Sequence, residues 1–207
     1  MKKVFLFFAA AGLFITPTIK AQESSVGIKG GVNLSTLSID DADDSNMKLG
    51  FHVGVFNKIA LTESFAIQPE LLYSRQGVKA DFDDVETKFN LNYINLPVKL
   101  VFNLSEDFEI QFGPYVGYLV NAKFKADGEL GPFNIDSEDD IDRDNFNTID
   151  YGLTAGIGFD LDPLIIGINY NVGLNGVVND DKADDFPYNR VGDAKNSVIQ
   201  VSVGLKF

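Results

Sequence analysis

The sequence contains no cysteine and no tryptophan, and His52 is its single histidine. Without cysteine we expect no disulfide-stapled module, no lipid anchor on a cysteine and no thiolate metal site. Basic residues are also few, since 17 Lys and Arg face 30 Asp and Glu and leave a formal net charge of −13. Nucleic-acid binding needs clustered Lys and Arg, so this balance argues against a nucleic-acid partner.

Long apolar runs are missing as well. Two lysines precede the longest run, Val4 to Ile15, and small and polar residues then lead to Ala21-Gln22. A run this short does not span a bilayer as a helix, so residues 1–22 are predicted to be a secretory signal peptide cleaved near Ala21/Gln22. Its removal takes three lysines away and lowers the formal net charge to −16. Residues 23–207 are expected to form one domain that is not a helical membrane protein.

What the sequence does contain is alternation of apolar and polar residues, which is typical of β-strands with two different faces. It recurs in eight segments, which cover residues 26–34, 49–55, 65–74, 89–102, 108–121, 148–159, 164–174 and 199–207. Strands of about 9–13 residues are long enough to cross a bilayer when tilted. In the fourth segment Phe89, Leu91 and Tyr93 have the opposite parity from Ile94 to Phe102, so either a bulge shifts the register or these three point inward.

The connections alternate between long and short. The long ones cover residues 35–48, 77–88, 124–146 and 175–195, and the short ones lie at residues 61–64, 104–107 and 161–163. Of the 30 acidic residues, 21 fall in the long connections. Outer-membrane barrels have short periplasmic turns and long extracellular loops, so one end of the molecule is predicted to face the cell exterior and to be strongly negative.

The polar face of the strands is rich in glycine, which suits a narrow lumen and weakens a solvent-facing sheet. The predicted fold is therefore all-β, an eight-stranded antiparallel up-and-down transmembrane β-barrel with its apolar face toward lipid. The alternative is a secreted calycin-like barrel that holds a small apolar ligand, and it requires the two faces to be exchanged.

Five polar residues of the inner face are candidates for a lumen network: Lys29, His52, Glu70, Lys99 and Glu109. They could form an ion path or gate, but an eight-stranded barrel is filled by its side chains, which favours an internal plug of salt bridges. A barrel enzyme would need His52 beside a serine such as Ser74 or Ser202, and neither serine has a nucleophile-elbow pattern. We therefore predict no enzyme, no catalytic residue and no cofactor.

The third long connection carries an acidic run with four weak candidates for a cation site: Asp136, Asp140, Asp142 and Asp144. The last three match the first positions of an EF-hand loop, but Asn145 replaces the required Gly and Tyr151 the terminal Glu. The EF-hand is rejected and no metal site is predicted, although weak divalent binding by the clustered carboxylates stays open.

Several short stretches resemble a known family. The final row Ile199, Val201, Val203, Leu205 and Phe207, together with Gln68-Pro69-Glu70-Leu71, Ile94-Asn95-Leu96-Pro97 and the Ala21-Gln22 context, is similar to the PorT-like outer-membrane β-barrels of Bacteroidetes. That family is itself similar to the small OmpX- and OmpA-type barrels. The resemblance implies a location in the bacterial outer membrane and a structural, surface-interaction or secretion-accessory role. It offers no catalytic motif.

The same resemblance indicates the partners. They are outer-membrane lipid and lipopolysaccharide, the barrel-insertion machinery, and type IX secretion components or surface ligands contacted through the loops. Phe207 is the candidate assembly signal for the insertion machinery. The protein is expected to be a monomer.

Overall fold

The computed structural model describes residues 24–38, 46–82, 85–130, 133–141, 146–178 and 194–207. They form nine β-strands: β1 (Ser24–Ser38), β2 (Asn46–Thr62), β3 (Phe65–Phe82), β4 (Val85–Asn103), β5 (Phe108–Leu130), β6 (Phe133–Ile141), β7 (Ile149–Leu161), β8 (Leu164–Gly173) and β9 (Lys195–Lys206). No helix among these residues is long and apolar enough to cross a membrane.

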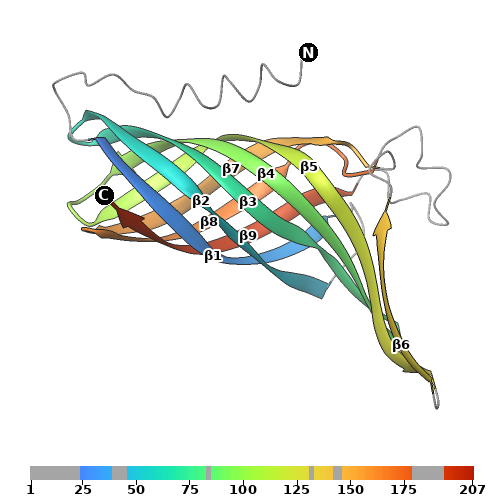
Figure 1. Ribbon diagram of the computed structural model, residues 1–207. Helices are drawn as coiled ribbons and strands as arrows, with labels where there is room; N and C mark the ends of the chain where they lie inside the picture. The colour runs from blue at the N-terminus through green and yellow to red at the C-terminus, as the bar shows by residue number, and fades with distance from the viewer. Residues whose placement is uncertain (1–23, 39–45, 83–84, 131–132, 142–145, 179–193) are drawn as a thin grey trace.

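Eight of the strands close into an antiparallel barrel (Figure 1). Each barrel strand pairs with its neighbour along the chain, except that β5 continues to β7 and leaves β6 outside the ring. β9 returns to pair with β1 along twelve residue pairs, from Gly27↔Lys206 to Ser38↔Lys195. The closure leaves none of the eight strands with an open edge within the barrel, which is what a lipid environment requires. The predicted fold class is confirmed.

The two ends of the barrel differ. At one end, tight turns join β2 to β3, β4 to β5 and β7 to β8, and the C-terminus lies beside them (Figure 1). We call this the short-turn end. At the other, the long-strand end, β3, β4 and β5 run on beyond the ring together with β6 (Figure 1). The three short connections therefore lie where the sequence predicts them.

The predicted boundaries of two long connections are wrong. Residues 77–88 are mostly strand, because β3 runs to Phe82 and β4 starts at Val85. Residues 124–146 contain the end of β5 and all of β6, which pair from Ala122↔Ile141 to Leu130↔Phe133. These extensions carry polar residues at both parities, so alternation ends there while backbone pairing continues. The strands β2 to β5 are 17–23 residues long, well beyond the predicted lengths.

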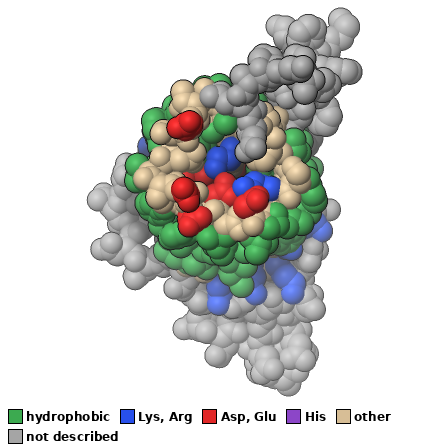
Figure 2. Space-filling view, turned by 90° about the vertical axis from the view of Figure 1, so that its left-hand side faces the viewer, with side chains coloured by type: hydrophobic (Ala, Val, Ile, Leu, Met, Phe, Trp, Pro, Cys, Tyr) green, Lys and Arg blue, Asp and Glu red, His purple; other side chains and the backbone are tan. Residues whose placement is uncertain are grey.

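The inner and outer faces follow the predicted parity. On β7 exposed and buried residues alternate along nearly the whole strand, with Tyr151 and Leu153 outside and Asp150 and Thr154 inside. The core of the molecule is therefore the lumen, and large apolar side chains cover the outer wall (Figure 2).

The register question in β4 has a clear answer. Leu91 and Tyr93 point inward and are almost fully buried, on the same parity as Lys99. A bulge does occur beside them, but it lies on β5, where Asn92 pairs with Asn121 and Tyr93 with Leu119. The extra residue of β5, Val120, is exposed.

Candidate functional site

A buried ion cluster lies in the middle of the lumen. Glu70 of β3 accepts hydrogen bonds from Lys29 of β1 at 3.1 Å and from Gln68 at 2.7 Å, and its carboxylate lies 3.0 Å from the ammonium of Lys99 of β4. The side chain of Glu70 is fully buried and that of Lys99 is 2% exposed. Two ammonium groups thus share one fully buried carboxylate.

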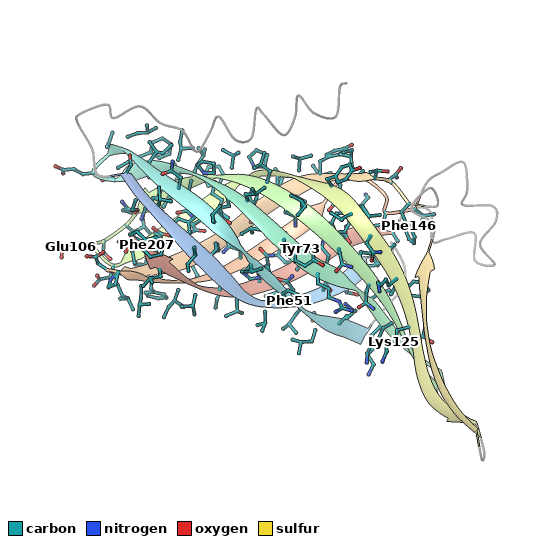
Figure 3. All side chains as sticks on the ribbon, in the orientation of Figure 1. Phe51, Tyr73, Glu106, Lys125, Phe146 and Phe207 are labelled. Atoms are coloured by element: carbon teal, nitrogen blue, oxygen red, sulfur yellow. The ribbon has the colours of Figure 1, made fainter. Side chains whose placement is uncertain are left out.

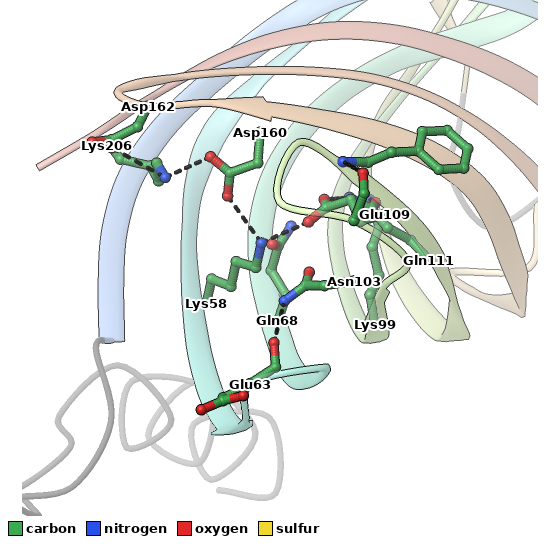
Figure 4. Close-up of polar contacts among 12 residues, drawn as sticks. Lys58, Glu63, Gln68, Lys99, Asn103, Glu109, Gln111, Asp160, Asp162 and Lys206 are labelled. Carbon is green, nitrogen blue, oxygen red and sulfur yellow. Dashed lines mark hydrogen bonds and ion pairs between the residues drawn. The ribbon is translucent and has the colours of Figure 1, made fainter.

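The polar contacts continue from this cluster toward the short-turn end. Lys99 donates to Gln111 at 3.2 Å, and Gln111 in turn donates to Glu109. Lys58 then donates to Glu109 at 2.6 Å and to Asp160 at 3.0 Å. The chain of contacts thus crosses between β4, β5, β2 and β7 (Figure 4).

At the short-turn end itself, Lys206 closes this chain. Its ammonium lies 2.5 Å from Asp160 and 3.2 Å from Asp162 (Figure 4). Around these ion pairs lies an open funnel of about 820 Å³, whose lining includes Lys58 and Phe207. Figure 2 looks into this funnel, and acidic and basic side chains fill its centre. The mouth is wide, but its floor is made of paired charges.

Above the ion cluster, His52 belongs to a separate polar group. Its Nδ1 lies 2.8 Å from Asn33 Oδ1, and Gln200 donates to the same oxygen at 3.2 Å. Ser74 is the cross-strand neighbour of His52, but its hydroxyl accepts a hydrogen bond from Asn33 at 3.0 Å. The other candidate serine, Ser202, donates to the carbonyl of Gly167. The three residues proposed for an enzyme, His52, Ser74 and Ser202, are thus each held by hydrogen bonds to other residues of the barrel wall.

The lumen is not polar throughout, in keeping with the alternative that Leu91 and Tyr93 point inward. Near the long-strand end, an apolar cluster fills it: Leu91, Tyr93, Leu119, Ala122, Phe146 and Val177. Beneath it Asp150 accepts hydrogen bonds from Tyr115 at 3.2 Å and Asn196 at 3.1 Å. We call the cluster of Leu91, Tyr93, Leu119, Ala122, Phe146 and Val177 the apolar cap. The polar lumen has a floor of ions and a cap of hydrocarbon.

Glycines on the inner face give the large lumen side chains their room. A Cβ on Gly27 would lie 2.4 Å from the ring of Phe56, and one on Gly152 would lie 2.7 Å from that of Tyr115. Between the ion cluster and the wall a gap of only about 10 Å³ lies beside Phe56. This is room for about one water molecule.

The outer wall has the opposite chemistry. Leu49, Val53 and Val203 are each more than half exposed, with 67%, 53% and 53% of their surface open. Aromatic rings pair near both ends of this apolar wall. Phe51 packs with Tyr73 toward the long-strand end (Figure 3). Close to the short turns, Phe102 packs with Phe112 and Phe108 with Phe159. An apolar band between two aromatic belts matches the surface that a bilayer covers.

Comparisons with known proteins agree with this surface. Residues 20–179 match the family model described as the outer membrane protein beta-barrel domain. The chain belongs to this family. Among solved structures it is similar to Ail, the attachment invasion locus protein of Yersinia pestis, with 14% identity and a TM-score of 0.50, over 90% of this chain and all of that one. Neisserial surface protein A is similar at 16% identity and a TM-score of 0.50, over the same shares.

A second structure of Ail, at 16% identity, a TM-score of 0.50 and the same coverage, is a complex with the heparin analogue sucrose octasulfate. At such identities the likeness shows the shared barrel fold alone. No curated protein sequence matches this chain significantly. Membership of the family places this protein in the bacterial outer membrane. By the rule for such barrels, the short-turn end is periplasmic and the long-strand end extracellular.

The structure places the five predicted lumen residues on the inner face, in two groups. Lys29, Glu70 and Lys99 form the ion cluster, Glu109 joins it through Gln111, and His52 lies apart with Asn33. Sequence reasoning missed Lys58 and Asp160, which connect Glu109 to the periplasmic mouth. A signal for Lys58 existed, because it shares the parity of His52 six residues earlier.

Two of the four weak cation candidates, Asp142 and Asp144, lie outside the described residues, and so does the segment predicted to be the signal peptide. Asp136 and Asp140 lie on β6, where they pair in register with Asp127 and Lys123 of β5. Within the described ranges, no group of three or more His, Asp or Glu side chains is placed to hold a metal ion.

Proposed function

We propose that this outer-membrane barrel is a closed, non-enzymatic protein that does not conduct and acts through its extracellular surface. The observation that carries the proposal is the filled lumen, with an ion-paired floor from Lys29 to Lys206 and the apolar cap above. The lumen of an eight-stranded barrel can be filled by its own side chains, and a lumen filled in this way favours a role for the surface. The extension of β3 to β6 provides such a surface.

The filled lumen also bears on the calycin-like alternative. A carrier of an apolar ligand needs an apolar cavity and a polar outer wall, whereas this barrel has charged residues inside and exposed leucine and valine outside. That alternative is not favoured.

Conductance measurements test the proposal directly. The full chain, reconstituted in a planar phosphatidylcholine bilayer, should produce no discrete current steps at moderate voltage. A conducting porin, reconstituted in the same bilayer, shows that the assay detects an open lumen. Regular, ion-selective steps from the parent protein would contradict the proposal.

The non-enzymatic part has its own test. If His52 only supports the packing of the barrel wall, His52→Ala should change the stability of the barrel and should not change any enzymatic activity. Hydrolysis of a lipid or peptide substrate that purified parent protein performs and His52→Ala loses would overturn this part of the proposal.

A secretion-accessory role with type IX components, implied by the PorT-like resemblance, stays a prediction. Loss of the gene should then reduce secretion of proteins by that pathway while other outer-membrane barrels keep their abundance. Normal secretion in the deletion strain would contradict it.

The predicted signal peptide and monomeric state complete the proposal. Mature protein from the membrane should begin next to the Ala21/Gln22 bond, at Gln22 or Glu23, and should sediment as a single chain in detergent. An N-terminus that retains residues 1–21, or a stable dimer, would contradict the corresponding part.

A further inference from the structure

The backbone hydrogen bonds of the barrel wall are interrupted at one level, across four neighbouring strands. The nine described strands contain three prolines, one each in the interior of β3, β4 and β5: Pro69, Pro97 and Pro114. Proline has no N–H and cannot donate to the ladder, so within sheets it is largely confined to edges and bulges. Three prolines in adjacent strands of a closed barrel therefore need an explanation.

The register shows where the ladder is broken. Each proline falls in a short stretch where the pairing with the preceding strand is skipped: Pro69 opposite Asn57, Pro97 opposite Glu70 and Pro114 opposite Val98. At each place the carbonyl of the opposite residue has no ladder donor, because the proline that faces it has no N–H. Pro69 also pairs in register with Val98, so the three breaks adjoin one another. We call this line of breaks the proline seam.

The strands on the other side of the barrel are paired without such breaks. Between β1 and β2, β1 and β9, β5 and β7, β7 and β8, and β8 and β9, the described register runs from its first pair to its last with no skipped residue. The missing hydrogen bonds are thus concentrated in the wall that β2, β3, β4 and β5 form. In hydrocarbon no water replaces them, which makes this wall the weaker part of the ladder.

The buried ion cluster lies at the same breaks. Each skipped stretch contains one inward charged residue that is at most 9% exposed: Lys58 at the first, Glu70 at the second and Lys99 at the third. Glu70 lies 3.0 Å from Lys99, which links β3 to β4, and Lys99 donates to Gln111 of β5 at 3.2 Å. Gln111 donates to Glu109, which accepts from Lys58 of β2 at 2.6 Å (Figure 4). One chain of polar contacts therefore joins the four strands whose backbone ladder is broken.

We propose that these five side chains, Lys58, Glu70, Lys99, Glu109 and Gln111, form a clasp that holds the proline seam closed. When the clasp is broken, the barrel opens locally along the seam. The opening unit consists of the parts of β2, β3, β4 and β5 around the prolines, while β1, β7, β8 and β9 stay paired. The closed barrel thus contains a defined place of opening that differs from global unfolding.

Hydrogen exchange tests the proposal. The full mature chain is reconstituted in phospholipid nanodiscs, and its fragments are analysed by mass spectrometry. In Glu70→Gln the clasp loses the carboxylate shared by Lys29 and Lys99, so amides of residues 94–100 in β4 should exchange at least about tenfold faster than in the parent. Amides of residues 164–172 in β8 should change by less than about twofold.

Asp150→Asn is the matched control. It makes the same change from carboxylate to amide at a lumen position that is 2% exposed, and the hydrogen bonds of Asp150 go to Tyr115 and Asn196, outside the clasp. Exchange in β4 should stay within about twofold of the parent in this variant. Lys99→Met removes a different member of the clasp and keeps the test usable if Glu70→Gln folds poorly.

The prolines give a second readout. Pro97→Ala restores an N–H opposite the carbonyl of Glu70, so the ladder can close there without the clasp. In this background Glu70→Gln should accelerate exchange in β4 by no more than about threefold, because the two changes act on the same break. Equal acceleration in β4 and β8 would overturn the proposal, since it would show global unfolding. So would the same acceleration with and without Pro97, or exchange in β4 of Glu70→Gln that equals that of the parent.

Discussion

Glu70 holds two lysines in the lumen, so its removal and the removal of Lys99 should have very different effects. Glu70→Gln keeps the size of the side chain but leaves the ammonium groups of Lys29 and Lys99 without their shared carboxylate. Lys99→Met also keeps the size and leaves one lysine with one glutamate. Both positions are almost completely buried, so a difference between the variants reports charge balance and not burial.

The expected magnitude follows from the distances. At 3.0–3.1 Å and an effective dielectric constant of about 20, each ion pair has a gross attraction of about 5 kcal/mol. Desolvation offsets most of this, and breaking a buried pair costs about 3–5 kcal/mol net. We expect Glu70→Gln to lower the free energy of unfolding by this amount, and Lys99→Met to lower it by about 1 kcal/mol, because the pair that remains is neutral.

Urea unfolding of the refolded barrel in detergent, followed by circular dichroism and by the heat-dependent shift in gel mobility, measures both values. Glu106→Gln, in an exposed turn, is the control and should change stability by less than about 0.5 kcal/mol. If Lys99→Met destabilised the barrel as much as Glu70→Gln, packing and not charge balance would hold the floor, and our reading of the cluster would be refuted.

Three further predictions concern the wall and the C-terminus. Deletion of Phe207, whose N–H donates to Val26 at 2.8 Å and whose side chain is largely exposed, should lower the amount in the outer membrane yet leave refolding in detergent normal; equal membrane yields would remove its role as an assembly signal. Spin labels on Val201→Cys should contact lipid while those on Gln200→Cys do not, since Val201 is 37% exposed and Gln200 6%; the reverse accessibility would refute the assigned faces. Gly152→Leu should destabilise the barrel by about 1–3 kcal/mol, because its Cβ would lie 2.0 Å from the carbonyl oxygen of Val172 and 2.7 Å from the ring of Tyr115, whereas unchanged urea unfolding would show that the barrel can adjust.

Alternation predicted the barrel because lipid and lumen impose opposite chemistry on successive residues of one strand. Within the bilayer every residue faces one or the other, so Val201 and Gln200 could be assigned from the sequence. Outside the bilayer both faces of a sheet meet water, and the pattern loses its meaning. That is why residues 77–88 and 124–146 appeared as loops although they continue β3, β4 and β5 and form β6.

The candidate site was predictable in kind and not in detail. Parity put Lys29, Glu70 and Lys99 on one face, but the partner of each depends on the stagger of the strands, which the sequence does not reveal. Lys58 and Asp160 are 102 positions apart and meet only because β2 and β7 face each other across the lumen. Parity allowed inward positions for Leu91 and Tyr93 as one of two alternatives, but it did not reveal the place of Ala122 in the apolar cap, since the bulge at Val120 changes which of the following residues of β5 point inward.

The positions of the charges follow one physical rule across the whole molecule. In the lumen and its mouth four lysines meet four carboxylates: Lys29, Lys58, Lys99 and Lys206 against Glu70, Glu109, Asp160 and Asp162. A weakly solvated interior tolerates charge when it is paired or hydrogen-bonded, and the lumen shows both arrangements, since Asp150 lies outside these ion pairs and accepts hydrogen bonds from Tyr115 and Asn196. Water tolerates an excess of either sign, and most of the acidic surplus accordingly lies in the connections.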